Sequence, residues 1–131
     1  MRGCIGTLDG SKPLIDSVTW SAVAAATRDH RFSGLSLAEF AEIDLEISVL
    51  GGFQEVSDPE EIVVGRDGLY LRAGSASGIF LPQVASEQGW DRETFLDHLC
   101  LKAGIPQGTW RRSDCVIERF SAEVFGEKPD L

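Results

Sequence analysis

A cysteine with unusual neighbours stands near the start of the chain, in the run Arg2-Gly3-Cys4-Ile5-Gly6. The flanking glycines permit backbone conformations that other residues avoid, and they allow a ligand to approach closely. A nearby guanidinium favours the thiolate of a cysteine, which is its nucleophilic form. The run therefore predicts a site at Cys4, with Arg2, Gly3 and Gly6 as candidate substrate-binding residues. The alternative is that Cys4 is a small residue in a tight bend.

The other cysteines have ordinary surroundings. The three cysteines are an odd set without CxxC spacing, which argues against a disulfide framework and against structural zinc. The cysteines and histidines lack the spacing of metal ligands, so we predict no metal site. Cys100 lies on an apolar helical pattern and Cys115 begins an apolar strand pattern, so both are expected to be small buried residues.

Composition limits the classes of function. A chain of 131 residues with 43% hydrophobic and 25% charged residues fits one globular domain, which we expect to span residues 1–131. A net charge of -9 disfavours general attraction to nucleic acid or to anionic membranes. The longest apolar runs fall far short of the roughly 20 residues that span a bilayer. We therefore expect a cytoplasmic protein with no nucleic-acid or membrane partner.

Apolar spacing predicts two principal helices. The first begins at Pro13, with Ser11 as its cap and Leu14 and Ile15 on its apolar face, and it ends near Thr27. A short helical turn is expected over residues 35–40. The second principal helix begins after a capping Asp91 and continues through Ala103, where Gly104 and Pro106 end it.

Strand patterns follow in succession. Alternation over residues 43–50 predicts a strand, and residues 62–64 and 69–71 predict a hairpin around the turn at 65–68. A second turn is expected over residues 73–78, and it leads into a further strand at 79–81, before Pro82 stops the pairing. Residues 116–125 predict one long strand, after which the chain from Gly126 is expected to fray. Without a βαβ rhythm, this order predicts an α+β fold with antiparallel pairing.

Five separated motifs resemble the AMMECR domain family, also called AmmeMemoRadiSam system protein A. They are Arg2-Gly3-Cys4-Ile5-Gly6, Glu46-Ile47-Ser48-Val49-Leu50, Leu81-Pro82-Gln83-Val84-Ala85, Glu87-Gln88-Gly89-Trp90-Asp91, and Leu99-Cys100 with Lys102-Ala103-Gly104; Asp29 with Arg31-Phe32 extends the match. The resemblance covers the chain from Arg2 to Phe125. It implies an α+β fold of two interlocked subdomains, with the Arg-Gly-Cys-Ile-Gly segment lining a cleft.

The resemblance adds further candidate site residues. Glu46 becomes a candidate for acid-base catalysis or cation binding, and Ser48 and Gln83 become candidates for binding substrate. The simpler interpretation of Glu46 and Ser48 is the solvated face of a strand. Family members usually carry a leucine before the arginine and a substantial upstream segment, whereas Met1 occupies that position here. We therefore expect the family's N-terminal segment to be missing, through a misassigned start or in a reduced member.

Two classes of function remain open, and neither the residues nor the resemblance identifies a reaction or a cofactor. In the first class, Cys4, Arg2 and Glu46 form a small-molecule site in which a thiolate acts as a nucleophile or redox group. In the second, the domain is a binding or scaffold partner of radical-SAM and Memo-type proteins, which the resemblance implies by association. An exposed sheet edge would also favour a homodimer.

Overall fold

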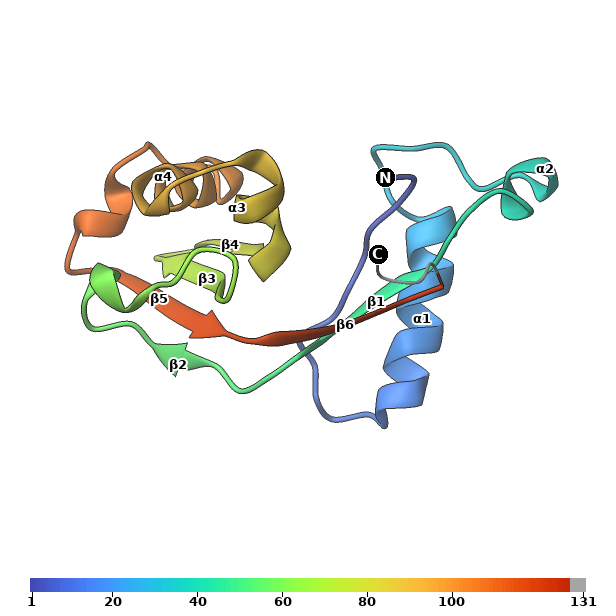
Figure 1. Ribbon diagram of the computed structural model, residues 1–131, viewed down its shortest axis with the longest axis horizontal. Coiled ribbons are helices and arrows are strands. Elements are labelled where there is room, and N and C mark those ends of the chain that lie inside the picture. Colours follow the sequence, from blue (N-terminus) through green and yellow to red (C-terminus); the bar gives the residue numbers. More distant parts are fainter. Residues whose placement is uncertain (128–131) are drawn as a thin grey trace. The chain divides into compact units, whose positions relative to one another are not determined.

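The computed structural model describes residues 1–127 as two compact units. Among the described residues, the first unit comprises Met1–Ile47 and residues 124–127, and the second comprises Ser48–Glu123 (Figure 1). The second unit is therefore one continuous segment of the chain, and the first unit is formed by the segments before and after it. The two units agree in number with the two subdomains that the resemblance implies, and the fold is α+β as expected.

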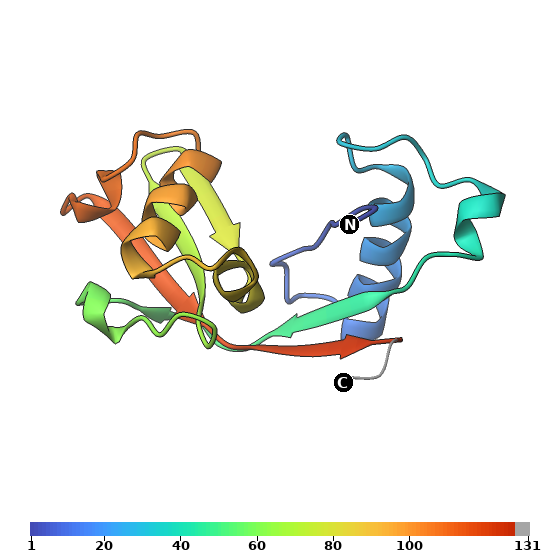
Figure 2. The same ribbon diagram turned by 45° about the horizontal axis from the view of Figure 1, so that its top comes forward.

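The second unit is built on an antiparallel sheet with the strand order β2-β5-β3-β4. Its strands are β2 (Gln54–Glu55), β3 (Gly68–Ala73), β4 (Ala76–Phe80) and β5 (Cys115–Phe120). Two helices, α3 (Pro82–Gln88) and α4 (Arg92–Lys102), pack on one face of this sheet (Figure 2). Two short 3-10 turns, η1 (Pro59–Glu61) and η2 (Thr109–Arg111), complete the unit.

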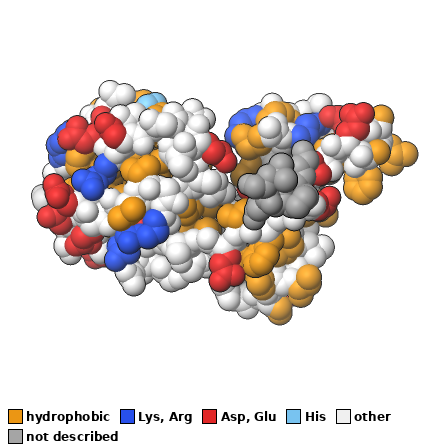
Figure 3. Space-filling view, in the orientation of Figure 1, with side chains coloured by type: hydrophobic (Ala, Val, Ile, Leu, Met, Phe, Trp, Pro, Cys, Tyr) orange, Lys and Arg blue, Asp and Glu red, His pale blue; other side chains and the backbone are white. Residues whose placement is uncertain are grey.

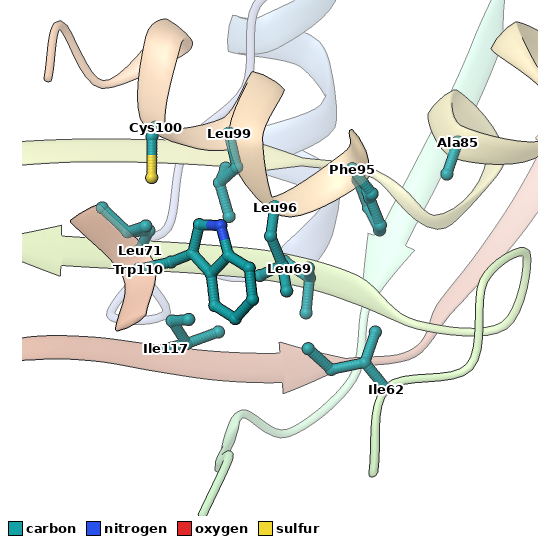
Figure 4. Packing of buried hydrophobic residues seen from close by; sticks show 10 residues of the cluster. All are labelled: Ile62, Leu69, Leu71, Ala85, Phe95, Leu96, Leu99, Cys100, Trp110 and Ile117. Carbon is teal, nitrogen blue, oxygen red and sulfur yellow. The ribbon is translucent and has the colours of Figure 1, made fainter. Parts of the chain in front are cut away.

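A hydrophobic core fills the space between these helices and the sheet (Figure 4). Helix α4 contributes one apolar stripe to it, and the facing strands contribute alternate residues, as a pleated sheet with one covered face requires. The fully buried members include Leu69, Leu71, Phe95, Leu96, Leu99 and Cys100. The opposite face of the sheet carries Phe120, whose ring stacks on Phe53 with the ring centroids 4.7 Å apart.

The first unit contains α1 (Leu14–Thr27) and α2 (Leu37–Phe40). Among its described residues, Ala24 is the one buried hydrophobic side chain. Several large apolar side chains of these helices are exposed instead, and hydrophobic atoms gather over α1 and α2 in Figure 3. They are Leu14, Ile15, Trp20, Val23, Leu37 and Phe40.

The chain passes between the units within two paired strands. These are β1 (Glu46–Leu50) and β6 (Ala122–Gly126), which form a separate two-stranded sheet. Beyond their ends, the Glu127 amide donates to the Leu45 carbonyl at 3.1 Å.

The helix predictions are largely confirmed, with corrections at the first helix. Asp91 caps α4 through a 2.8 Å hydrogen bond from the Thr94 amide to its carboxylate. In α1 the cap position is Pro13 and no side chain caps the helix, so the predicted role of Ser11 is wrong. Leu14 and Ile15 are exposed rather than buried. Helix α3 lies outside the predicted helices, because Pro82, which is expected to end a strand, is also the first residue of this helix.

Three strand predictions need correction. Residues 62–64 form no strand, so the predicted hairpin around 65–68 is absent. The strand predicted at 79–81 forms as β4, which ends at Phe80, just before Leu81, and β4 pairs with β3 through the turn at Gly74 and Ser75. The first predicted strand is shorter and begins at Glu46. The long strand over 116–125 is divided at Ser121 into β5 and β6. Fraying was predicted from Gly126, which belongs to β6, and residues 128–131 lie outside the described part of the chain.

Candidate functional site

A buried carboxylate organises the segment around Cys4. Asp29 follows the end of α1, and its side chain is only 5% exposed. One of its oxygens accepts a hydrogen bond from the Cys4 amide at 2.9 Å. The guanidinium of Arg31 binds both oxygens, with Nε donating at 3.0 Å and Nη2 at 2.7 Å. Asp29 therefore holds the backbone of Cys4 and the side chain of Arg31 at the same time.

The electrostatics of this cluster favour an ionised Asp29. The Arg31 guanidinium, followed by the amides of Cys4 and Arg31, holds the pKa of the Asp29 carboxyl far below its usual range, against the opposing effect of burial. Reciprocally, the hydrogen bond to Asp29 raises the pKa of Arg31, and the charge of a Cys4 thiolate contributes in the same direction. The Cys4 residue itself is exposed. The cluster thus places an accessible thiol within electrostatic reach of a guanidinium.

Arg2 is engaged with the segment around α2. Its Nε donates to Glu39 at 2.7 Å and its Nη2 to the Ser33 carbonyl at 2.6 Å. Glu39 also closes a capping box with Ser36 at the start of α2. The hydrogen bond from Arg2, followed by those from Ser36, lowers the pKa of Glu39 to about 2. The Nη1 atom of Arg2 is buried without a hydrogen-bond partner in the described part of the chain.

The two candidate glycines have different surroundings. A Cβ placed on Gly3 would collide with the backbone carbonyl of Ala25 in α1. No atom lies within 4 Å of a Cβ placed on Gly6. Gly3 therefore allows the N-terminal segment to pass close to α1. At Gly6 there is space for a side chain.

The remaining predicted site residues lie along β1 and α3. Glu46 is exposed at the first position of β1. Ser48 and Gln83 are brought together within the second unit, where the Gln83 amide donates to the Ser48 hydroxyl at 3.5 Å. No hydrogen bond or ion pair joins any of these three side chains to Cys4 within residues 1–127. Two of the predicted polar residues thus meet each other in a pair separate from the cluster at Asp29.

The other two cysteines lie in the second unit, away from solvent to different extents. Cys100 is buried and Cys115 is half-buried, and burial raises the pKa of both thiols. Among residues 1–127, no group of histidine, cysteine and acidic side chains is arranged to hold a metal ion. In the same residues no helix is long and apolar enough to cross a membrane.

Three residues of this cluster were not predicted as site residues. Asp29, Arg31 and Glu39 lie far from Cys4 in the sequence, so spacing could not connect them to it. The available signal was the Asp29 and Arg31-Phe32 match to the family, which marked the segment without showing its contact with Cys4. The capping-box pattern of Ser36 and Glu39 was also readable, but it gave no reason to expect Arg2 as a partner.

Comparisons with known proteins establish the class to which this fold and segment belong. The AMMECR1 family model matches residues 1–125, and the chain belongs to the AMMECR1 family. Protein MK0488 of Methanopyrus kandleri is 44% identical over 135 residues, which cover 98% of this chain and 65% of the relative. Protein MJ0810 of Methanocaldococcus jannaschii is 43% identical over 133 residues, with 97% and 66% covered.

A solved structure is similar over the same region. The chain superimposes on the crystal structure of the uncharacterised protein PH0010 from Pyrococcus horikoshii with a TM-score of 0.93 and 39% sequence identity. The match covers 97% of this chain and 65% of that one. The chain therefore spans just under two thirds of the length of these relatives, and the confirmed part of the prediction is the family and its α+β fold.

Proposed function

We propose that the first unit carries a thiol-based small-molecule site in which Cys4 is the nucleophile or redox group. The observation that carries the proposal is the double role of Asp29, which binds the Cys4 amide and the Arg31 guanidinium together. The guanidinium stabilises a thiolate by charge, while the exposure of Cys4 leaves that thiolate accessible to a substrate.

The roles of orienting the substrate and positioning the segment are assigned to two arginines. Arg31 is the better candidate for orienting an anionic group of the substrate, because its side chain is 54% exposed. Arg2 has its Nε and Nη2 groups bound to Glu39 and Ser33, so we assign it a positioning role. Glu46 remains a candidate for acid-base catalysis in its own right, and the Ser48–Gln83 pair of the second unit remains a separate candidate for binding substrate. A cytoplasmic location remains part of this proposal.

The test is the rate of alkylation of each cysteine by iodoacetamide as a function of pH, measured by mass spectrometry. Cys4 is expected to react fastest and to remain reactive below the ordinary cysteine pKa of about 8.5. In Arg31→Met the rate should fall, because the substitution removes the charge that favours the thiolate. Arg31→Lys keeps the charge and should retain most of the reactivity.

Arg28→Met is the matched control, because it removes the same charge from the same exposed segment and Arg28 binds no side chain among residues 1–127. The proposal fails if Cys4 in the folded protein reacts no faster than in urea. It fails equally if Arg28→Met and Arg31→Met lower the rate to the same extent.

The second candidate is a non-catalytic binding or scaffold role beside radical-SAM and Memo-type metalloproteins. The exposed apolar side chains of α1 and α2 favour it, since large apolar patches commonly mark interaction surfaces. Binding of a purified Memo-type protein should then survive Cys4→Ser and be lost in Ile15→Lys with Val23→Lys. Retained binding in the lysine variant would argue against this candidate.

A further inference from the structure

A pocket of about 290 Å³ lies in the second unit, and none of its lining residues belongs to the cluster at Cys4. It is formed by the chain before β2, the turn before β3 and the end of β5. Its polar lining consists of Gln54, Arg66, Asp67, Arg119 and Ser121. Two arginines in one pocket are unexpected in a chain whose net charge is -9.

The position of Arg119 follows from the pleat of β5. Side chains alternate along a strand, so Arg119 lies on the same face as Ile117, which is buried in the core. Its cross-strand neighbours are Leu69 on β3 and Gln54 on β2. An arginine therefore takes the place at the margin of the core that an apolar residue would ordinarily fill.

Arg119 lacks the partners that such a position requires. Its Nε atom is buried without a hydrogen-bond acceptor, and the guanidinium forms no ion pair within 4 Å, among the residues that the structure describes. A buried donor without an acceptor, and a half-buried charge without a counter-ion, are both unfavourable. Arg119 lines the pocket, so an anionic ligand there can supply the counter-charge that its guanidinium lacks.

The carboxylate of the pocket, Asp67, already has hydrogen-bond donors within the protein. Asp67 accepts hydrogen bonds from the Val63 amide and from Arg66 Nε and Nη2, each at 2.9 Å. Burial opposes its ionisation, but Arg66, the Val63 amide and the charge of Arg119 together lower the pKa of Asp67. Asp67 and Arg66 thus neutralise one another, and Arg119 leaves the pocket with one net positive charge.

We propose that this pocket binds a small organic carboxylate through Arg119. A carboxylate matches both the single positive charge and the planar donor fork of a guanidinium. Gln54 and Ser121 add neutral hydrogen-bonding groups. The volume lies near the lower end of the range for small-molecule sites, about 300–1,000 Å³, which favours a small acid over a nucleotide. The site is independent of Cys4.

The test is titration of the isotopically labelled protein with sodium butyrate, followed by amide chemical shifts at equal ionic strength. Saturable shifts are expected at Gln54, Arg119 and Ser121, and Arg119→Met should weaken binding at least about ten-fold, the usual order for losing a charged partner. The methionine keeps most of the side-chain length and removes the unpaired buried donor. Circular dichroism should therefore show that Arg119→Met folds.

Arg72→Met is the matched control, because Arg72 lies on the neighbouring strand β3 and pairs with Glu118 outside the pocket lining. It should bind butyrate like the unchanged protein. The proposal is overturned if butyrate causes no saturable shift at the pocket, or if both variants weaken binding equally. Inorganic phosphate is titrated in parallel, and tighter binding of phosphate at the same residues would overturn the assignment to a carboxylate.

Discussion

At the scale of single residues, Asp29 connects three parts of the first unit that are separate in sequence. It follows α1, fixes the Cys4 backbone and binds the Arg31 side chain. Arg2 and Glu39 form a second ion pair between the N-terminal segment and α2. The conformation of the Arg-Gly-Cys-Ile-Gly run is therefore stabilised mainly by polar contacts and by its close approach to α1.

The close approach at Gly3 leads to the first prediction. Gly3→Ala should destabilise the protein by about 1–3 kcal/mol, the usual cost of forcing extra atoms into a filled site. The added Cβ meets the backbone carbonyl of Ala25, which cannot rotate away as a side chain could. Gly6→Ala is the matched control, with an expected change within about 0.5 kcal/mol because open space surrounds that position. Urea unfolding measures both, and equal effects would contradict the predicted contact.

The ion pair at Glu39 leads to a prediction about pH. The pKa of Glu39 is lowered from 4.5 to about 2 in the folded protein, first by the hydrogen bond from Arg2. A lowered carboxyl pKa stabilises the folded state above the unfolded pKa, and this contribution is lost as pH falls through the folded pKa. Glu39→Gln should therefore be less stable than the unchanged protein near neutral pH, and the difference should shrink between pH 4.5 and about 2.

Urea unfolding at several pH values, followed by circular dichroism, checks this expectation. Glu42→Gln is the control, because Glu42 is exposed in the same segment and its side chain binds no residue in the described chain. A difference between Glu39→Gln and the unchanged protein that stays constant with pH would show that the ion pair does not stabilise the fold.

At the scale of elements, α4 is the helix whose two faces differ most clearly in their surroundings. Leu99 is fully buried against the sheet, and Leu101 on the same helix is 50% exposed. Leu99→Ala should lower the free energy of unfolding by about 2–5 kcal/mol, because it removes buried methyl groups and leaves a cavity. Leu101→Ala should cost about 1 kcal/mol or less, since less apolar area is removed from water. Thermal unfolding compares the two, and similar costs would contradict the assignment of the buried face.

The elements that the sequence predicts well are those that are defined by signals within their own residues. Helix α4 has a cap at Asp91, an apolar stripe and a glycine beyond its end, and its prediction is confirmed. The predicted strand at 62–64 is wrong, because an apolar residue can be buried without belonging to a strand, and Ile62 is such a residue. It is fully buried in the core from an irregular segment, and its neighbours form no strand.

The pocket at Arg119 could not be predicted for a related reason. Arg66 and Arg119 are far apart in the sequence, and a single arginine in a strand pattern is ordinarily a solvated residue. The antiparallel pairing of β5 with β2 and β3 brings Arg119 to the margin of the core. Local patterns contain no information about this long-range pairing.

At the scale of the whole molecule, the two units differ in how they use their apolar residues. The second unit buries nearly all of the core, whereas in the first unit Ala24 alone is buried among the described hydrophobic residues. Apolar area that stays in water contributes nothing to folding and is available for association. We propose that the predicted homodimer forms through this exposed apolar surface of the first unit.

Self-association through these side chains should increase with salt. The net charge of -9 makes copies of the chain repel one another, and added salt screens this repulsion while it leaves apolar contact intact. Sedimentation velocity should show a larger average mass at about 1 M sodium chloride, where the Debye length is about 3 Å, than at low salt. Ile15→Lys with Val23→Lys should abolish this change, whereas Leu101→Lys, an exposed apolar position of the second unit, should not. A monomer at every salt concentration would mean that the exposed apolar surface of α1 does not drive self-association.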